Sequence, residues 1–189
     1  MVQRELIICG TGEKMIKITD LTHKLIKEKT SINIAVDMTV GWGNDTLVLV
    51  SNSEFVYGFD IQKKALDKAD ILLKENGFAN YQLINENHEF ILNHIDQKID
   101  LCLYNLGYLP KGDKTIFTEA TSTINSLKSV MTLLNEDGLI ILVVYSHNKQ
   151  EKENLFSFCK TLSSEYDVMY YQVMNKENCP ELITIKKVV

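Results

Sequence analysis

The chain has 189 residues, of which 45% are hydrophobic and 24% charged, and its formal net charge is −5 at pH 7. This composition is ordinary for a soluble globular protein, and the length suits one domain spanning residues 1–189. The negative charge disfavours a broad nucleic-acid-coating surface, although a local basic patch stays compatible with it.

Neither a membrane segment nor a metal motif is evident in the sequence. No apolar run reaches transmembrane length, and the N-terminus lacks a signal-peptide pattern, so we expect a cytoplasmic protein without a membrane partner. The four cysteines are far apart, and none belongs to a CxxC pair or a His-rich cluster, so we expect no metal site. They are Cys9, Cys102, Cys159 and Cys179.

Hydrophobic periodicity predicts helices and strands in alternation along the chain. The helices are expected over residues 13–29, 44–51, 62–76, 89–94, 118–134 and 151–164. The strands are expected over residues 33–38, 55–60, 81–84, 99–104, 139–145, 167–174 and 181–188. The last two strands are separated by a short polar segment that ends in Pro180, which suits a hairpin-like close.

Nearly continuous apolar strands indicate a sheet that is covered by helices on both faces. No repeat, low-complexity tract or Pro/Ser-rich linker divides the chain. The sequence therefore predicts an α/β, Rossmann-like three-layer sandwich, in which a seven-stranded and mostly parallel sheet carries an antiparallel terminal strand.

Residues 34–60 have the order strand, glycine loop, helix, strand and acid that is typical of half a nucleotide-binding unit. Gly41 and Gly43 let backbone approach a ligand closely. Asn44 and Asp45 can cap a helix that opens around Thr46. The last residue, Asp60, can accept hydrogen bonds from a ribose diol.

The glycine loop differs from a dinucleotide fingerprint because Asp37 precedes the glycines. A carboxylate at that place would repel a pyrophosphate, whereas it suits a ligand with a cationic or amino-acid end. S-adenosylmethionine, which carries a sulfonium, an amino acid and a ribose but no phosphate, meets this description. A nicotinamide-dependent oxidoreductase is correspondingly disfavoured. Trp42, between the two glycines, either covers the cofactor or packs on the N-terminal helix.

Polar or glycine-containing loops follow five of the expected strands. They span residues 37–45, 60–62, 85–88, 105–114 and 145–147. In an open α/β sheet, ligands bind beyond the carboxyl ends of the strands, so these loops should converge on one site.

The segment Asn105-Leu-Gly-Tyr-Leu-Pro has the layout of the Asn-Pro-Pro-Tyr motif of amino-group methyltransferases. In that arrangement an Asn side-chain oxygen and a backbone carbonyl accept hydrogen bonds from the target amine, and an aromatic ring stacks on the substrate. An alkylammonium must also lose a proton before attack, for which Asp113, His147 and Tyr108 are candidates. The alternative for Asn105 is a turn cap at a strand end.

Taken together, these segments resemble the rRNA methylase-like family of small bacterial methyltransferases. Its members are assigned as tRNA 5-aminomethyl-2-thiouridine methyltransferases. The resemblance runs from about residue 14 to the end. It rests on Asp37-x-Thr-x-Gly-x-Gly-x-Asp-Thr46, Gly58-Phe-Asp-Ile-Gln62, His88, Asn105-Leu-Gly-Tyr-Leu-Pro-x-Gly-Asp-Lys114 and Tyr145-x-His147.

The resemblance implies a class I methyltransferase fold, S-adenosylmethionine as donor and the wobble-uridine aminomethyl nitrogen of tRNA as acceptor. It also implies a homodimer. The cofactor residues that it implies are Asp37, Thr39, Gly41, Gly43, Asn44, Asp45, Thr46, Asp60, Ile61, Gln62, His88, Asn105, Leu106 and Gly107. The catalytic residues are Asn105, Asp113, Tyr145 and His147, and the substrate-binding residues are Tyr108, Lys111 and Lys114.

Several positions depart from the family pattern. Met38 and Val40 stand where small alanines are expected, Trp42 stands for Asn, and Lys111 stands for Gly. The glycines expected after residue 147 are replaced by Asn-Lys-Gln. These departures leave open a methyltransferase for rRNA or a small amine, and a non-catalytic S-adenosylmethionine-binding protein.

Some residues allow two interpretations. His88 is either a polar group at a helix N-terminus or a ligand contact, and Tyr145 is either strand-end packing or a substrate contact. His23 is either a surface or capping histidine, or part of a helix that packs on the cofactor side. The lysines of the acceptor loops either receive tRNA phosphates or are simply solvated.

Overall fold

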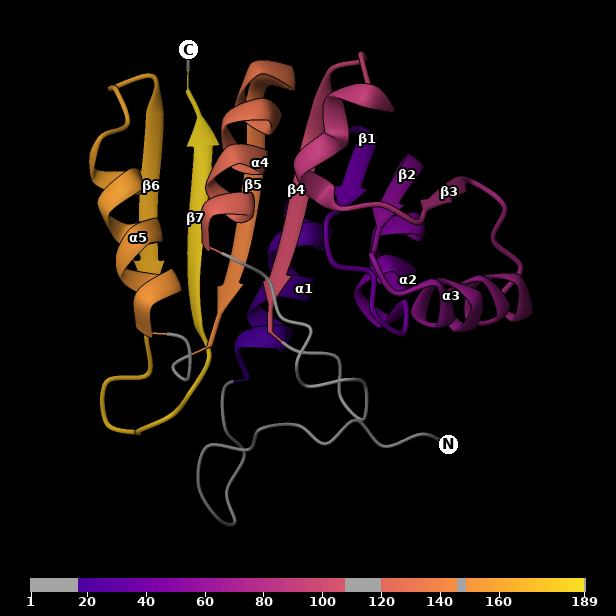
Figure 1. Ribbon diagram of the computed structural model, residues 1–189, viewed down its shortest axis with the longest axis horizontal. Coiled ribbons are helices and arrows are strands. Elements are labelled where there is room, and N and C mark those ends of the chain that lie inside the picture. The colour runs from indigo at the N-terminus through magenta and orange to yellow at the C-terminus, as the bar shows by residue number, and fades with distance from the viewer. Residues whose placement is uncertain (1–16, 108–119, 146–148, 189) are drawn as a thin grey trace.

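In the computed structural model, residues 17–107, 120–145 and 149–188 are described. Their strands form one seven-stranded sheet in the order β3-β2-β1-β4-β5-β7-β6 (Figure 1). The strands are β1 (Ile32–Asp37), β2 (Ser53–Phe59), β3 (Tyr81–Ile84), β4 (Ile99–Leu106), β5 (Leu134–Val144), β6 (Tyr166–Tyr171) and β7 (Glu181–Lys187). The first five are parallel, and β7 is antiparallel to both of its neighbours, as predicted.

Helices cover both faces of the sheet and complete the three layers (Figure 1). The helical elements are α1 (Ile18–Glu28), α2 (Asn44–Val50), α3 (Lys63–Glu75), η1 (His88–Asn93), α4 (Ala120–Leu133) and α5 (Lys149–Lys160). Helix α1 contacts α2, β5 and β7, whereas α4 contacts η1, β4 and α5. None of the helices in the described part of the chain is both long and apolar enough to span a membrane.

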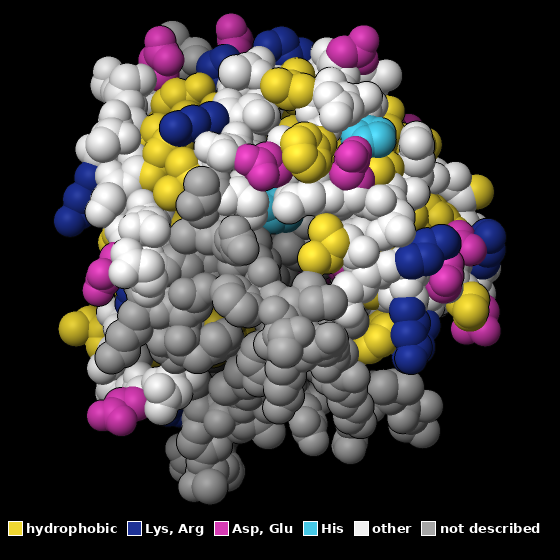
Figure 2. All heavy atoms as spheres, in the orientation of Figure 1, with side chains coloured by type: hydrophobic (Ala, Val, Ile, Leu, Met, Phe, Trp, Pro, Cys, Tyr) yellow, Lys and Arg dark blue, Asp and Glu magenta, His cyan; other side chains and the backbone are white. Residues whose placement is uncertain are grey.

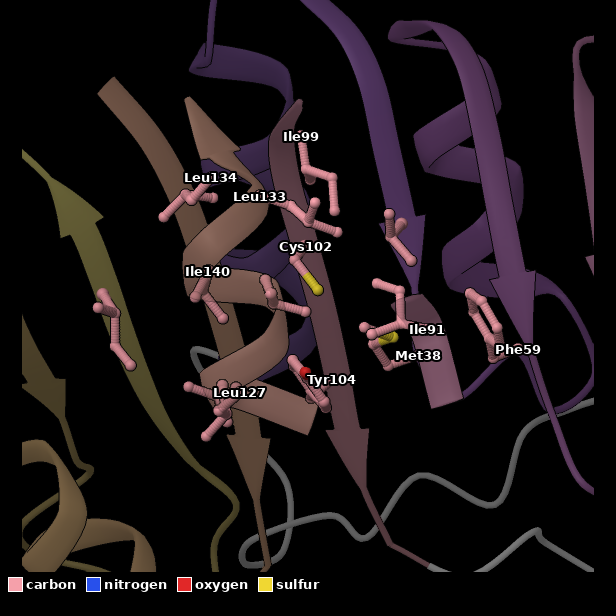
Figure 3. Close-up of a cluster of buried hydrophobic side chains, with 14 of the residues drawn as sticks. Met38, Phe59, Ile91, Ile99, Cys102, Tyr104, Leu127, Leu133, Leu134 and Ile140 are labelled. Carbon is pink, nitrogen blue, oxygen red and sulfur yellow. The ribbon is translucent and has the colours of Figure 1, made fainter. Parts of the chain in front are cut away.

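The core is divided into two layers by alternation along β4, which is buried on both faces. Cys102 and Tyr104 point into the layer beneath η1, α4 and α5 (Figure 3). Leu101 and Leu103 point into the opposite layer, with residues of α1 and α2. The central strand therefore has no solvent-facing side.

The extents of β4 and β5 differ from the sequence-based expectation in a way that matters for the site. Strand β4 continues through Asn105 to Leu106, because both residues pair with β5. Strand β5 begins at Leu134, which pairs with Ile99, before the register shifts to Leu139. The expected Asp137-Gly138 turn is therefore an irregularity inside β5, where Asp137 has a φ of 60°.

The prediction that residues 1–189 form a single domain stays a prediction.

Candidate functional site

The centre of the sheet is a topological switch point. Strand β1 lies between β2 and β4, and it ends at Asp37 beside the end of β4. Beyond this end, the backbone N–H of Met38 still donates to the carbonyl of Leu103 at 2.8 Å. In open α/β sheets, a crevice at such a point is where ligands bind.

The glycine loop leaves β1 and folds against α3. Gly43 has a φ of 80°, and a Cβ built on it would lie 2.8 Å from the Cβ of Ala69. Its N–H donates to the carbonyl of Val40 at 2.8 Å. Gly41 also has a positive φ, of 52°, and its N–H donates to Oδ2 of Asp60 at 2.8 Å. The loop is thus held between α3 and the acid that follows β2.

Asp60 is held by two backbone N–H groups. Oδ1 accepts from Gln62 at 2.8 Å, while Oδ2 accepts from Gly41. Each carboxylate oxygen keeps a second lone pair, which is what two ribose hydroxyls require. Burial raises the pKa of Asp60, and the two N–H donors oppose that rise. The neighbouring Ile61 side chain is exposed, as a contact for an adenosine moiety would be.

Asp37 is a buried carboxyl group at the end of β1. It accepts a 2.7 Å hydrogen bond from the Thr46 hydroxyl and a 3.0 Å bond from the Thr39 N–H. Burial raises its pKa to about 7, and the charges of Asp45 and Asp60 add to that rise. Three carboxyl groups in one region would repel phosphate and favour a cationic ligand.

The predicted capping by Asn44 and Asp45 is wrong. Helix α2 begins at Asn44, its N-cap is Gly43, and no side-chain hydrogen bond caps it. Asp45 lies within the first turn, where a carboxylate interacts favourably with the helix dipole. Its oxygens are directed to other elements: Oδ1 lies 2.8 Å from Nε2 of His23, and Oδ2 accepts from Nδ2 of Asn105 at 2.9 Å.

Asn105 has a strand conformation and pairs with Val143. Its backbone N–H donates to Oγ1 of Thr39 at 2.7 Å. The side chain reaches across to Asp45 on α2, so the interpretation of Asn105 as a cap for its own turn does not describe the side chain. Asn105 therefore links β4, the glycine loop and the start of α2.

The residues around Asn105 are closely packed. Leu106 is buried, and a Cβ built on Gly107 would lie 3.1 Å from the Tyr145 ring, so the ring lies directly over this glycine. Tyr145 also packs against the core layer of α1 and α2. Packing is therefore one established role of Tyr145, and a role in catalysis stays a prediction.

His88 is the first residue of η1, while the cap of that helix is the Asn87 side chain. The imidazole is buried and meets the Tyr104 ring edge to face, with 5.7 Å between centroids. Burial lowers the pKa of His88 to about 4. The ring therefore packs against the core at Tyr104, and a cofactor contact of His88 stays a prediction.

Trp42 has a neighbour that neither sequence-based alternative named. The ammonium of Lys68, on α3, lies 3.9 Å from the centroid of the indole ring, which is the geometry of a cation–π contact.

Five predicted acceptor-side residues lie outside the described residues: Tyr108, Lys111, Asp113, Lys114 and His147.

The contact of His23 with Asp45 was not predicted from the sequence. His23 follows Thr22 and precedes Lys24, and it belongs to no apolar stripe. Its partner Asp45 lies 22 residues away in the chain. Only the docking of α1 against α2 brings the two side chains together.

Comparisons with known proteins agree with this geometry. Residues 56–187 match the model of the family described as "Putative rRNA methylase". The chain is 29% identical over 190 residues to a chloroplastic tRNA (mnm(5)s(2)U34)-methyltransferase of Arabidopsis thaliana, covering 90% of this chain and 69% of that protein.

Two solved structures are similar along nearly the whole chain. One is a putative rRNA methylase from Clostridium thermocellum, which is 33% identical with a TM-score of 0.87. The other is a putative methyltransferase from Streptococcus mutans in complex with SAH, which is 32% identical with the same TM-score. Each match covers 93% of this chain and 100% of the other. The chain therefore belongs to the family described as putative rRNA methylase and has the fold of a class I S-adenosylmethionine-dependent methyltransferase.

Proposed function

We propose that this chain methylates the aminomethyl nitrogen of 5-aminomethyl-2-thiouridine at the wobble position of tRNA. The coarser part of this statement rests on the family and on the related structures: the chain is an S-adenosylmethionine-dependent methyltransferase. The acceptor is supported by the name of the Arabidopsis relative and by the arrangement around Asn105.

The residues at the switch point fit the cofactor. Asp60 has lone pairs for a ribose diol, and the carboxyl groups of Asp37 and Asp45 favour the cationic methionine end. The cofactor supplies a sulfonium methyl group: the acceptor nitrogen forms the new C–N bond, and the C–S bond pair stays on sulfur to give S-adenosylhomocysteine.

The observation that carries the proposal is the anchored amide of Asn105. Its nitrogen donates to Asp45, so its oxygen is the atom that can accept a hydrogen bond from the acceptor N–H. Such a bond directs the nitrogen lone pair towards the methyl group, which is catalysis by positioning. The acceptor must lose its ammonium proton before attack and a second proton after transfer.

We assign the remaining catalytic and substrate roles as proposals. Asp113 and His147 are candidates for the proton acceptor, together with Tyr145. Tyr108, Lys111 and Lys114 are candidates for contacts with the nucleotide and its phosphates.

The distribution of charge on the surface is compatible with tRNA binding to a small patch. The formal net charge is −5, and basic and acidic side chains are interspersed on the face shown in Figure 2. Phosphate contacts would therefore be local rather than spread over the molecule. A cytoplasmic setting and a homodimer that shares the docking surface are parts of the same proposal.

Methyl transfer from a tritiated donor to separated RNA pools tests the acceptor class. The purified protein is expected to label tRNA from a strain that lacks its gene, and to leave tRNA from the parent strain unlabelled. Label confined to rRNA would support the alternative that the family description suggests. Label in neither pool, together with no heat of S-adenosylhomocysteine binding, would contradict a methyltransferase.

A further inference from the structure

Three side chains from three elements form a hydrogen-bonded chain that ends at the proposed reaction site. His23 is on α1, Asp45 is in the first turn of α2, and Asn105 is near the end of β4. Nε2 of His23 lies 2.8 Å from one carboxylate oxygen of Asp45, and Nδ2 of Asn105 lies 2.9 Å from the other. The Asp45 side chain is 9% exposed and the His23 side chain 26% exposed, so the chain is largely shielded from water.

The chemistry of the central carboxylate determines the direction of both bonds. An ionised carboxylate only accepts hydrogen bonds, so the group that each neighbour presents to it must be an N–H. His23 therefore carries a proton on Nε2, and Asn105 turns its NH₂ group towards Asp45. The amide orientation of Asn105, which decides whether it can hold an amine, follows from this contact.

A second anchor restricts Asn105 further. Its backbone N–H is bound to Oγ1 of Thr39 at 2.7 Å. With the backbone and the amide nitrogen both held, the side-chain oxygen has a defined direction. Within the described part of the chain, that oxygen accepts no hydrogen bond, and it can therefore accept one from a substrate.

The Asp45 carboxylate requires hydrogen-bond donors for both of its oxygens. It is buried, and it lies close enough to Asp37 for its charge to contribute to the raised pKa of that residue. A carboxylate in such surroundings is costly unless its oxygens are hydrogen-bonded. His23 supplies a donor to the oxygen that Asn105 does not contact, so it stabilises the ionised and correctly oriented form of Asp45.

We propose that His23 is a positioning residue for methyl transfer, because through Asp45 it holds the Asn105 amide with its oxygen towards the acceptor nitrogen. This inference rests on the proposed function. In this role His23 acts through Asp45 rather than on the reacting atoms. Its contribution is therefore to the rate of methyl transfer rather than to the affinity for the cofactor.

The first test needs no substrate. The side-chain amide resonance of Asn105 in ¹⁵N-labelled protein is assigned by its loss in Asn105→Ala. It is expected to shift in His23→Phe, which keeps an aromatic ring but loses the donor, and to stay in place in Lys24→Ala. Lys24 is the next residue of the same helix, and it is exposed and paired with Glu28. An unchanged resonance in His23→Phe would overturn the proposal.

The second test is kinetic. His23→Phe is expected to lower kcat by about tenfold with an unchanged KM for S-adenosylmethionine, because misplacement of a positioning group affects the chemical step. His23→Gln, whose amide can place an N–H near the position of Nε2, is expected to recover most of the loss. Lys24→Ala is expected to match the wild type. Loss of activity without recovery in His23→Gln, together with a raised KM for the cofactor, would indicate a structural role and overturn the proposal.

A double-mutant cycle links His23 to Asn105. If His23 acts through Asn105, then His23→Phe adds nothing to the defect of Asn105→Ala, whereas independent effects would multiply. A double variant whose loss of rate is the product of the two single losses would overturn the proposal. Failure of the wild type to methylate tRNA would contradict the proposed acceptor instead, and the amide resonance would still decide whether His23 orients Asn105.

Discussion

Asp37 and Thr46 are joined by a 2.7 Å hydrogen bond between the buried carboxyl group that ends β1 and a hydroxyl in the first turn of α2. The bond ties the start of the glycine loop to its end. Burial nevertheless raises the pKa of Asp37 to about 7, since the hydrogen bonds from Thr46 and Thr39 compensate only part of the lost hydration.

The raised pKa of Asp37 predicts a pH-dependent stability. The folded value of about 7 exceeds the unfolded value of about 3.9, so the folded protein binds the proton more tightly. The contribution is fully present below about pH 4 and is lost as the pH rises towards 7. The free energy of unfolding of wild type minus that of Asp37→Asn should therefore fall over this window. Urea unfolding at several pH values measures it, and parallel curves for the two proteins would contradict the assignment.

His88 should give the opposite dependence. Its folded pKa of about 4 lies below the unfolded value of about 6.5 because the imidazole is buried. Its contribution is present above about pH 6.5 and is lost as the pH falls towards 4. The stability difference between wild type and His88→Gln should therefore shrink on acidification. Because the effects of Asp37 and His88 oppose each other, the wild-type profile alone would conceal both. A difference that grows on acidification would contradict a neutral, buried His88.

Two glycines with the same positive φ allow the cost of backbone strain to be measured separately from the cost of overpacking. Gly43 and Gly77 both have a φ of 80°, but only Gly43 lies against a neighbour, the Cβ of Ala69. Gly77→Ala should cost about 1–2 kcal/mol from the left-handed conformation alone. Gly43→Ala should cost a further 1–3 kcal/mol, roughly, from overpacking against α3. Chemical unfolding measures both, and equal losses would show that the glycine loop is not held tightly on α3.

Asp60 should determine cofactor affinity. Asp60→Ala removes the acceptors for the ribose and the anchor of the Gly41 N–H, and each hydrogen bond to a charged group is worth about 1.5–3 kcal/mol. Calorimetry with S-adenosylhomocysteine should show a loss of affinity of at least about tenfold. Asp67→Ala is the matched control, since that acid is exposed and paired with Lys63 on α3. Equal affinity in the two variants would place the ribose elsewhere.

The sheet was predictable because its central strands β4 and β5 contain long apolar runs and most strands are bounded by polar or glycine-containing loops. The order of strand, glycine loop, helix and acid around Asp37 and Asp60 follows from local sequence. The contacts of Asp45 with His23 and Asn105 do not follow from local sequence, because the position of Asp45 before an apolar run is equally typical of a helix cap. His23 could not be placed, because its contact depends on how α1 docks against α2. That docking is a property of packing between elements rather than of the pattern within either element.

The residue at which β4 ends could not be predicted from the sequence either. Asn105 is polar and lies two residues before a glycine, which is typical of a strand end, yet it pairs with Val143 and continues the strand. Pairing with β5 determines this boundary. The consequence is functional: a strand holds the Asn105 amide more rigidly than a loop would.

The most direct measurement of the central claim is mass spectrometry of tRNA nucleosides from a strain that lacks the gene. The wild-type gene should restore 5-methylaminomethyl-2-thiouridine, as should Lys24→Ala. Asn105→Ala and Asp60→Ala, expressed at equal levels, should leave the unmethylated 5-aminomethyl-2-thiouridine. Full restoration by Asn105→Ala would contradict the role of the amide, and unchanged methylated nucleoside in the deletion strain, in the absence of a second enzyme, would contradict the proposed acceptor.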